Sequence, residues 1–467
     1  MKKPTKAPAE TGIRKTARKK PAAKKSILKK KPAVKKAAAK KPAPKKRPVV
    51  KKAAVKKPAP KKKPVVKKAA VKKAAPKKKS AVKKAPAKKP APKKKAAVKK
   101  TRPPAKKSAV KRTSRVKKTV ATAAPAVNWD EIYEMEIVTR ARGWNRARDV
   151  GTIEGINRRM AFGGFLDVIR DADRAYEAAI WKIAGEILGR RDTVRMVVVA
   201  GPSSSGKTTT TLKLRDALRA MGEDPLVLPL DNYFWNLKDQ PRDEHGDYNF
   251  ESPKALDIET INRNLTDLLV GRETVAPVYN FKTGLREEEG VKVSLAPGQL
   301  LLVEGLHGLH EPMSEGIPEE TRYRVYIEAI CQLQDRDYNF VPWTDIRLLR
   351  RMVRDNLHRN YTPERTLGHW HYVRREEKQY IVPFIARAEA VVNGYLPYEL
   401  PIYKKYLYKS LKKAVENYAG VGGREDAYRR GLRCLGWLEE INELEDDSVI
   451  PAGSLIREFI GGGIYEY

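Results

Sequence analysis

Short apolar runs alternate with helix-length amphipathic segments in the second half of the chain. The first run, Met196–Ala200, is wholly apolar, and it is followed by a segment that suits the start of a helix. Strands separated by helix-length connections form parallel sheets that helices cover on both faces, so the pattern predicts an α/β fold. Functional side chains are then expected at the carboxyl ends of the strands. The other predicted strands are Pro225–Leu230, Leu300–Val303, Tyr323–Ile330 and Ala388–Val392.

Helical periodicity flanks this predicted sheet on both sides. Residues 129–190 place apolar side chains on one face and predict one or two helices that lead into the first strand. Residues 403–443 predict two further helices with a break at Gly420–Gly423. The expected domains are a disordered basic tail (1–120), a helical lead-in (128–192), an α/β domain (193–400) and a helical C-terminal extension packed on the core (401–467).

The excess of positive over negative charge is confined to the tail. Residues 1–120 contain 51 Lys and Arg side chains and one acidic side chain, Glu10, whereas the rest of the chain contains 47 basic and 54 acidic side chains. A 16-residue unit of Lys, Ala, Pro and Val recurs from Lys40, Lys56, Lys72 and Lys88. This composition buries too little apolar surface to offset the entropy of ordering, so it predicts a disordered tail biased toward polyproline II. A repeat solenoid is not favoured, since the unit lacks an apolar face for stacking.

The expected partner of the tail is a polyanion. DNA or RNA is the first candidate, and acidic membrane surfaces and polyphosphate are further candidates. Recognition would be of backbone charge, because the tail has no aromatic residue to stack on bases. In composition the segment resembles the Lys/Ala/Pro-rich tails of histone H1-like proteins. A solubility tail and a targeting sequence are the alternatives. The expected location is the cytoplasm, with association with the nucleoid as a hypothesis about the tail.

A phosphate-binding loop follows the first predicted strand directly. Glycines let the loop backbone curl so that successive N–H groups point at one anion, and a helix N-terminus adds a favourable dipole. Lys207 can reach the outer phosphates, and the Thr208 hydroxyl can bind Mg²⁺. The pattern therefore predicts a nucleoside triphosphate site. Its expected cofactor-binding residues are Gly201, Ser203, Ser204, Ser205, Gly206, Lys207, Thr208 and Thr209.

Two carboxylates stand at the ends of later predicted strands. Asp231 follows the second strand, where a carboxylate can accept the proton of an attacking hydroxyl, and it is the candidate catalytic base. The alternative for Asp231 is a helix N-cap or turn aspartate. Glu304 ends the apolar run Leu300–Val303 and resembles a Walker B carboxylate that helps to hold Mg²⁺.

A cationic segment follows the fourth predicted strand. Forked guanidinium groups suit phosphate oxygens, and the segment 356–366 after them is expected to act as a lid. A solvated basic helix is the alternative, with Asp345 and Asp355 pairing with some of the arginines. The cationic side chains are Arg347, Arg350, Arg351, Arg354 and Arg359.

Cysteine and histidine positions add little chemistry. Cys331 and Cys434 are too few for a disulfide framework, and no apolar stretch of 18 residues predicts a membrane span. His307 and His310 are spaced for one face of a helix, and a strand or loop is expected around His369 and His371. These histidines are expected to be pocket or surface residues and not metal ligands.

Taken together, the motifs resemble the uridine kinase and phosphoribulokinase family of P-loop kinases, over roughly residues 195–400. The segments that carry the resemblance are GPSSSGKTT (201–209), LDNYF (230–234), PRDEHGDYNFESPKALD (241–257), PVYNFKTGLR (277–286), LLVEGLHGL (301–309) and RLLRRMVRD (347–355). The resemblance implies a P-loop NTPase kinase fold with ATP and Mg²⁺ as cofactors. The end of the chain, from Ile450, also resembles a bacterial branch of uridine kinase-like proteins, and no chemistry is visible in it.

The same resemblance implies roles for individual residues. Lys207 and Thr208 would serve ATP and Mg²⁺, with Glu304 helping to hold the metal and Asp231 deprotonating the acceptor. The implied substrate-binding residues are Glu251 and Arg351 for ribose hydroxyls, Tyr279 and Phe281 for the base, and Arg286, while Arg354 and Arg359 would reach phosphates. One departure from the family pattern is the absence of a histidine from residues 279–286, which leaves pyrimidine specificity open.

Three classes of function remain at this point. The first is a small-molecule kinase that phosphorylates a nucleoside 5′-hydroxyl, with a phosphoribulokinase-like sugar-phosphate kinase as its alternative. The second is a nucleic-acid-compacting protein that uses the kinase fold as a scaffold, which the presence of Lys207, Asp231 and Glu304 disfavours. The third is a GTPase-like switch, which is disfavoured because this sequence lacks the Asn-Lys-x-Asp motif that recognises guanine. The sequence is compatible with a homo-oligomer and does not indicate one.

Overall fold

The computed structural model describes residues 136–242, 246 and 248–466. The basic tail predicted at 1–120 and the start of the predicted lead-in lie outside the described residues. The first described element is the helix α2 (Glu136–Ala147), followed by α3 (Ile153–Phe162) and α4 (Phe165–Leu188). The lead-in therefore contains three described helices, and not the one or two predicted, because the stretch 148–152 and the glycine pair Gly163–Gly164, with φ of 90° and 84°, interrupt it.

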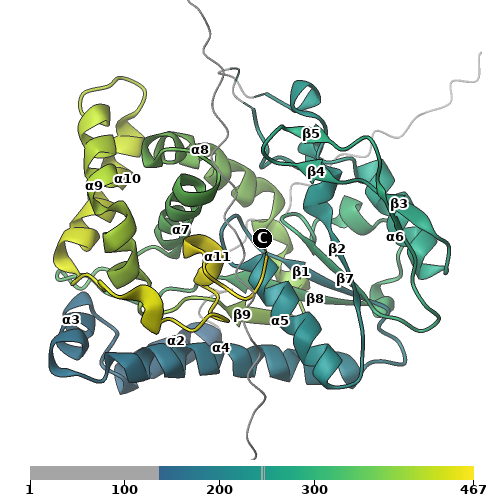
Figure 1. Cartoon of the computed structure of the whole chain (residues 1–467), viewed down its shortest axis with the longest axis horizontal. Helices are drawn as coiled ribbons and strands as arrows, with labels where there is room; N and C mark the ends of the chain where they lie inside the picture. Colours follow the sequence, from purple (N-terminus) through teal and green to yellow (C-terminus); the bar gives the residue numbers. More distant parts are fainter. Residues whose placement is uncertain (1–135, 243–245, 247, 467) are drawn as a thin grey trace, which may run out of the picture. The chain divides into compact units, whose positions relative to one another are not determined.

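A five-stranded parallel sheet forms the centre of the described chain (Figure 1). Every residue of β1, β7 and β8 is buried, as expected for strands covered on both faces. The predicted α/β class is therefore confirmed, and strand bounds differ from the predicted ones by only a few residues. In spatial order the strands are β2 (Leu226–Pro229), β7 (Leu301–Gly305), β1 (Met196–Ala200), β8 (Arg322–Glu328) and β9 (Ala390–Asn393).

Alternate residues of the strands enter two separate hydrophobic clusters. Val197 and Val199 pack with helices α4 and α5 (Lys207–Ala220) on one face of the sheet. Met196 and Val198 pack with α6 (Ile258–Leu269) on the other face. Successive strand side chains point to opposite faces, so an unbroken apolar run is what a sheet covered on both sides requires.

The chain between β2 and β7 forms a peripheral region next to α6. It contains the short 3₁₀ helices η1 (Leu230–Tyr233), η2 (Leu237–Asp239) and η3 (Pro253–Ala255). Two small antiparallel ladders follow, β3 (Thr274–Ala276) with β6 (Val291–Val293) and β4 (Tyr279–Asn280) with β5 (Leu285–Arg286). Figure 1 shows this region on one side of the sheet, with α9 and α10 on the opposite side.

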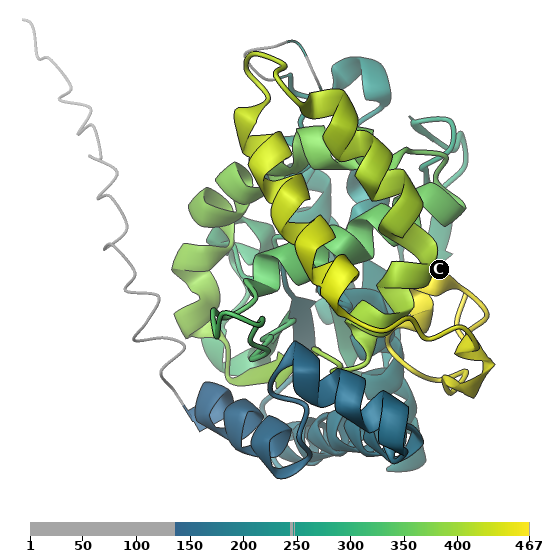
Figure 2. The ribbon, with the colours of Figure 1, turned by 90° about the vertical axis from the view of Figure 1, so that its left-hand side faces the viewer.

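The helices after β8 form a second layer. They are α7 (Trp343–His358), α8 (Pro363–Tyr380), α9 (Glu399–Tyr418) and α10 (Glu425–Glu440), and the last two pack as a pair that faces the viewer in Figure 2. Short 3₁₀ helices lie at Glu311–Ser314, Glu319–Thr321, Val382–Arg387 and Asp447–Val449, and α11 (Arg457–Ile460) ends the described elements.

Two local predictions about histidines are wrong. His369 and His371 lie within α8, and not on a strand or loop, because the cap at Thr362 and Pro363 begins a helix that the apolar pattern alone did not reveal. His307 and His310 lie in the turn after β7, and not on a helix. No helix among the described residues is both long enough and apolar enough to span a membrane.

A buried carboxylate joins α4 to the end of the chain. Asp173 is 7% exposed, and its Oδ1 accepts a 2.9 Å hydrogen bond from the hydroxyl of Tyr398, which in turn lies 2.8 Å from the Ser454 hydroxyl. Its other oxygen, Oδ2, is buried without a partner among the described residues. Burial raises the pKa of Asp173 to about 6, although Tyr398 and Ser454 oppose the shift.

We predict that Asp173→Asn stabilises the protein above pH 6. The folded-state pKa lies above the unfolded value of 3.8, so the unfolding free energy of the wild type falls as the pH rises from 4 toward about 6. Asparagine keeps an acceptor for Tyr398 without a charge, so it avoids an ionisation cost of about 1–3 kcal/mol. Urea unfolding at pH 4.5 and pH 8 measures the difference. An Asp173→Asn protein that is less stable than the wild type at pH 8 contradicts this reading.

Candidate active site

The loop between β1 and α5 has the shape that a phosphate-binding loop requires. Ser204 and Gly206 have positive φ angles of 59° and 99°, which curl the backbone toward the N-terminus of α5. At Gly201, a Cβ atom would lie 2.3 Å from the carbonyl oxygen of Ile327 on β8, so only glycine fits there. We call residues 201–208 the phosphate loop.

Arginines of α7 hold the phosphate loop by its carbonyl oxygens. Arg347 donates to the Ser203 carbonyl at 3.1 Å, and Arg350 donates to the Ser205 and Ser204 carbonyls at 2.8 and 3.3 Å. Both arginines were expected to bind phosphate oxygens, and their contacts correct that expectation. Neither side chain has any exposed surface, so neither can reach a ligand without leaving the core.

Buried carboxylates neutralise these two arginines. Arg350 forms two hydrogen bonds of 2.8 and 2.6 Å with Glu399, the first residue of α9. Arg347 lies 2.7 Å from Glu328 at the end of β8 and 2.7 Å from Glu377 of α8. A fully buried guanidinium requires such partners, since removing one partner of a buried pair costs about 3–5 kcal/mol.

The inner side of the phosphate loop leaves donors available. The structure records no protein acceptor among the described residues for the backbone N–H groups of Lys207 and Thr208, at the first turn of α5. The hydroxyl oxygens of Ser204 and Ser205 are buried without a partner in the same described part of the chain. Unpaired donors at a helix N-terminus fit a bound polyphosphate, which would satisfy them.

The sheet register brings the two predicted carboxylates next to this loop. Glu304 of β7 pairs with Val199 of β1 on one side and with Pro229 of β2 on the other. Asp231 lies two residues beyond Pro229, in η1, so β7 places Glu304 between the phosphate loop and Asp231. Lys207 Nζ is 3.9 Å from Glu304 Oε1.

The charges around Glu304 favour the binding of a divalent cation. Burial, together with the charges of Asp231 and Glu458, raises the pKa of Glu304 to about 8, although Lys207 opposes the shift. Three carboxylates thus face one lysine, and a cation would relieve their repulsion. Mg²⁺ is usually held by one or two protein oxygens plus phosphates and water, so the Thr208 hydroxyl and Glu304 fit the metal that the sequence implied.

Across the site, Glu251 and Arg351 form a half-buried ion pair. Arg351 donates to Glu251 and also to the Ser203 hydroxyl at 2.8 Å, so it joins Glu251 to the phosphate loop. Burial alone would raise the pKa of Glu251, but the guanidinium of Arg351 holds that pKa below its usual value. His307 Nε2 lies 2.8 Å from the Glu251 carbonyl oxygen, and burial lowers the pKa of His307 to about 4, which keeps the ring neutral.

Arg354 and Arg359 share one carboxylate at the end of α7. Arg354 Nε donates to Asp355 at 3.0 Å, and Arg359 lies 3.7 Å from the same side chain. Repulsion by Arg354 and then burial lower the pKa of Arg359 to about 10. This excess of positive charge suits an anionic group. Of the lid predicted at 356–366, only residues 359–362 lie outside helices α7 and α8.

Aromatic rings line the side of the site next to η1. The Tyr279 ring lies 5.0 Å from that of Phe281 and 5.5 Å from that of Phe234. Tyr279 is 6% exposed, whereas Phe281 is 52% exposed and has the Arg359 guanidinium 5.4 Å from its ring centre. Phe281 is therefore the ring that a ligand can reach.

Two sequence-predicted residues use their polar groups for other contacts. Arg286 donates to the carbonyl oxygens of Tyr233 and Phe234 at 2.7 and 2.8 Å, so its contacts hold η1 in place. Thr209 was expected to bind the cofactor, but its N–H and hydroxyl both donate to Glu458, at 3.0 and 2.7 Å.

Several residues at the site have no assigned role in the sequence analysis. Phe234 and His307 lie within motifs that the sequence analysis quoted, LDNYF and LLVEGLHGL, so the sequence marked both segments. The Phe234 ring lies beside that of Tyr279. Glu399 and Glu458 lie at and beyond the end of the predicted α/β domain, 95 and 154 residues after Glu304 in the chain numbering, and no spacing rule connects residues so far apart. They reach the site only because α9 and α11 pack on α7.

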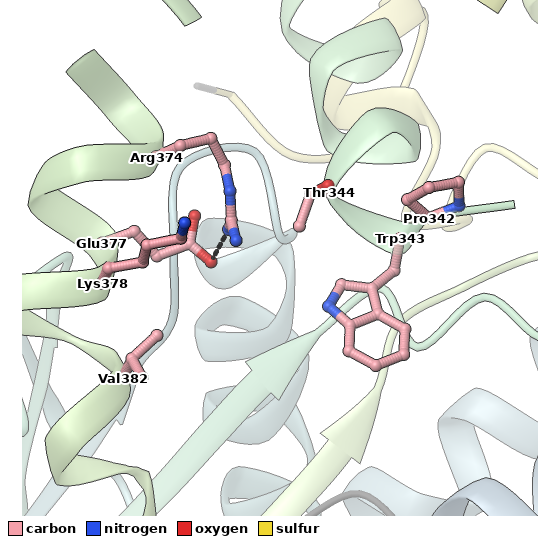
Figure 3. Close-up of a pocket in the computed structure, with 7 residues that line it drawn as sticks. All are labelled: Pro342, Trp343, Thr344, Arg374, Glu377, Lys378 and Val382. Carbon is pink, nitrogen blue, oxygen red and sulfur yellow. Dashed lines mark ion pairs between the residues drawn. The ribbon is translucent and has the colours of Figure 1, made fainter. Parts of the chain in front are cut away.

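A separate pocket of about 290 Å³ opens between the start of α7 and the end of α8 (Figure 3). Arg374 and Glu377 form an ion pair on one side of it, with the Trp343 ring on the other. None of its lining residues is among the predicted site residues. They are Pro342, Trp343, Thr344, Arg374, Glu377, Lys378 and Val382.

Comparisons with known proteins agree with this geometry. Residues 196–397 match the model of the phosphoribulokinase / uridine kinase family. The uridine kinase of Halobacterium salinarum is 27% identical over 195 residues, which are 42% of this chain and 77% of that enzyme. The uridine kinase of Deinococcus deserti is 29% identical over 198 residues, 42% of this chain and 86% of that enzyme.

Among solved structures, D-glycerate 3-kinase from Cryptococcus neoformans is 15% identical, with 58% of this chain and 89% of that chain covered and a TM-score of 0.26. The tail, the whole lead-in and all residues from 398 onward lie outside the matched residues. Over residues 196–397 the chain is similar to the phosphoribulokinase / uridine kinase family, and the protein is a small-molecule kinase, a phosphotransferase that uses ATP and acts on a hydroxyl group.

Proposed function

We propose that the kinase domain phosphorylates the 5′-hydroxyl of a nucleoside such as uridine or cytidine. The observation that carries this proposal is the half-buried Glu251–Arg351 pair, which Arg351 joins to the phosphate loop at Ser203. An ionised carboxylate beside a guanidinium can accept hydrogen bonds from two neighbouring sugar hydroxyls. The exposed ring of Phe281, with Tyr279 behind it, offers a flat surface for a base.

In the proposed reaction, Asp231 accepts the proton of the attacking hydroxyl. The hydroxyl oxygen forms a bond to the terminal phosphorus of ATP, and the bond from that phosphorus to the bridging oxygen breaks, which leaves ADP. Lys207 and Arg354 stabilise the charge that develops on the transferred phosphoryl group. Mg²⁺, held by Thr208 and Glu304, would neutralise phosphate charge when bound. Arg359, which faces Asp231 and Phe281, would contact the phosphates of ATP.

A sugar-phosphate acceptor is the second candidate. Arg354 and Arg359 share Asp355 as their carboxylate partner, so they could bind an acceptor phosphate as well as a phosphate of ATP. The segment 279–286 also lacks the histidine expected for pyrimidine recognition. An uncharged nucleoside needs no cationic side chain to bind it. Activity only with acceptors that carry a phosphate would therefore favour this alternative.

The tail supports a further proposal, binding of the enzyme to DNA or another polyanion. Its 51 basic side chains against one acid would release counterions from a nucleic acid backbone, which makes binding steeply dependent on salt. The rest of the chain, with more acids than bases, has no comparable excess of positive charge. We therefore assign nucleoid association to the tail and cytoplasmic phosphate transfer to the kinase domain.

We predict that Asp231→Asn lowers kcat by about 10²–10⁴-fold, the range typical of losing a general base. The KM for ATP should change less than about threefold, because Asp231 belongs to the acceptor side of the reaction in this proposal. ADP release is measured with uridine, cytidine, other nucleosides and ribulose 5-phosphate as acceptors. Asp239→Asn is the matched control, since Asp239 is exposed in the same stretch. Unchanged turnover in Asp231→Asn, or the absence of any acceptor, refutes the proposal.

We predict that Glu251→Gln raises the KM for the nucleoside about 10–100-fold and leaves the KM for ATP nearly unchanged. Glutamine fills the same space but cannot accept two hydroxyl hydrogen bonds as a carboxylate does. The wild type should prefer a ribonucleoside to its 2′-deoxy analogue, and the variant should lose most of that preference. Glu289→Gln, at an exposed glutamate, is the control. A variant that keeps the full preference shows that Glu251 does not contact the sugar.

We predict that deleting residues 1–118 abolishes salt-sensitive retention on DNA and leaves kcat and KM within about twofold of the full chain, since the deleted charges carry the electrostatic term. Elution from immobilised DNA over a salt gradient is compared with turnover of the same preparations. Retention by the shortened chain, or a large loss of turnover, contradicts the separation of the two roles.

A further inference from the structure

The last described segment of the chain packs directly on the phosphate loop. Leu455 lies so close to Gly206 that a Cβ atom there would be 2.6 Å from Leu455 Cδ1. Leu455, Ile456 and Phe459 have no exposed surface and belong to the main hydrophobic cluster. The Phe459 ring also lies 5.1 Å from the guanidinium of Arg350, the arginine that binds the loop carbonyls. The segment is therefore continuous with the core around the loop.

Helix α5 begins without a capping side chain of its own. Its N-cap residue is Gly206, so no side chain at that position can accept a hydrogen bond from the first turn. The first backbone N–H groups of a helix have no partner within the helix and need one from elsewhere. Glu458, 249 residues further along the chain, supplies it, because its Oε2 accepts from the Thr209 N–H at 3.0 Å and from the Thr209 hydroxyl at 2.7 Å.

This contact divides the donors of the first turn of α5 into two sets. The N–H of Thr209, the third helical residue, is taken by Glu458, whereas those of Lys207 and Thr208 have no recorded acceptor among the described residues. The first two positions are thus left for phosphate oxygens, and the third is fixed by protein. Glu458 is 9% exposed, so water competes little for its carboxylate.

The segment is anchored too firmly to be displaced by each incoming nucleotide. Its beginning is held through Ser454, which lies 2.8 Å from the hydroxyl of Tyr398. Arg457 holds its other side by donating to the carbonyl oxygens of Asp447 and Ile450 at 2.8 and 2.7 Å. With three fully buried apolar side chains as well, the contact between Glu458 and Thr209 belongs to the folded enzyme and not to a removable cover.

We propose that Glu458 is a positioning residue of the phosphate-binding site, which caps α5 from the end of the chain and so orients Lys207 and Thr208 toward the phosphates of ATP. This inference rests on the proposed function only in taking ATP as the ligand of the loop. It assigns to the C-terminal extension a part in phosphate transfer, although the extension lies outside the residues that match the kinase family.

The test compares Glu458→Gln, which keeps an oxygen acceptor, with Glu458→Met, which keeps the volume and removes the acceptor. Binding of MgATP to the full chain is measured by calorimetry without an acceptor substrate. We expect about a tenfold or greater loss of affinity for Glu458→Met and less than about threefold for Glu458→Gln, consistent with loss and retention of a helix cap. Glu466→Met, at an exposed glutamate near the end of the chain, should bind as the wild type does.

Hydrogen–deuterium exchange of the nucleotide-free protein provides a second readout that does not depend on ATP. Glu458→Met should exchange faster than the wild type in peptides that cover residues 201–214, with no change in peptides from α6, while Glu458→Gln should match the wild type. Equal or tighter MgATP binding by Glu458→Met would overturn the proposal and show that the carboxylate competes with phosphate. Unchanged exchange at α5 would overturn it as well. If the wild type binds no MgATP, the proposed function fails, and exchange alone decides the role of Glu458.

Discussion

Two buried arginines on α7 determine how the phosphate loop is built. Arg347 and Arg350 bind the carbonyl oxygens of residues 203–205, and a loop whose carbonyls are held from outside presents its N–H groups inward. Burying two guanidinium groups is possible only because Glu399 and the pair Glu328 and Glu377 neutralise them. Strand β8 and helices α8 and α9 therefore help to fix the shape of the loop through these carboxylates. None of the three elements contacts a phosphate in the proposed mechanism.

Charge is separated across the site in a way that suits phosphoryl transfer. Glu304, Asp231 and Glu458 gather where the phosphate loop meets the ends of β7 and β2, and burial, with the charges of the other two carboxylates, raises the pKa of Glu304 to about 8. Arg354 and Arg359 gather at the end of α7, where their repulsion lowers the pKa of Arg359. Neither group is balanced by protein alone, so a cation at the first and an anion at the second would stabilise both.

The end of the chain has a closer connection with the site than its distance in sequence suggests. Leu455 fills the space beside Gly206, Phe459 packs on Arg350, and Glu458 caps α5. Because of these contacts, the C-terminal helical segment packs as part of the kinase domain and does not form a separate unit. The extension shares one hydrophobic cluster with the sheet, so its stability and that of the phosphate loop are coupled.

The sequence by itself determined the elements whose signals are local. Apolar runs of strand length predicted the parallel sheet. They also placed Asp231, Glu304 and the loop that leads to Lys207 at one edge, because parallel strands bring their carboxyl ends together. Only the tertiary structure decided which groups Arg347 and Arg350 bind, since a guanidinium that binds a loop carbonyl and one that binds a phosphate look the same in sequence. The contacts of Arg286, Thr209 and Glu458 were decided in the same way. Each depends on a partner brought close by packing between distant segments, and such proximity is a property of the folded chain that no local pattern of residues encodes.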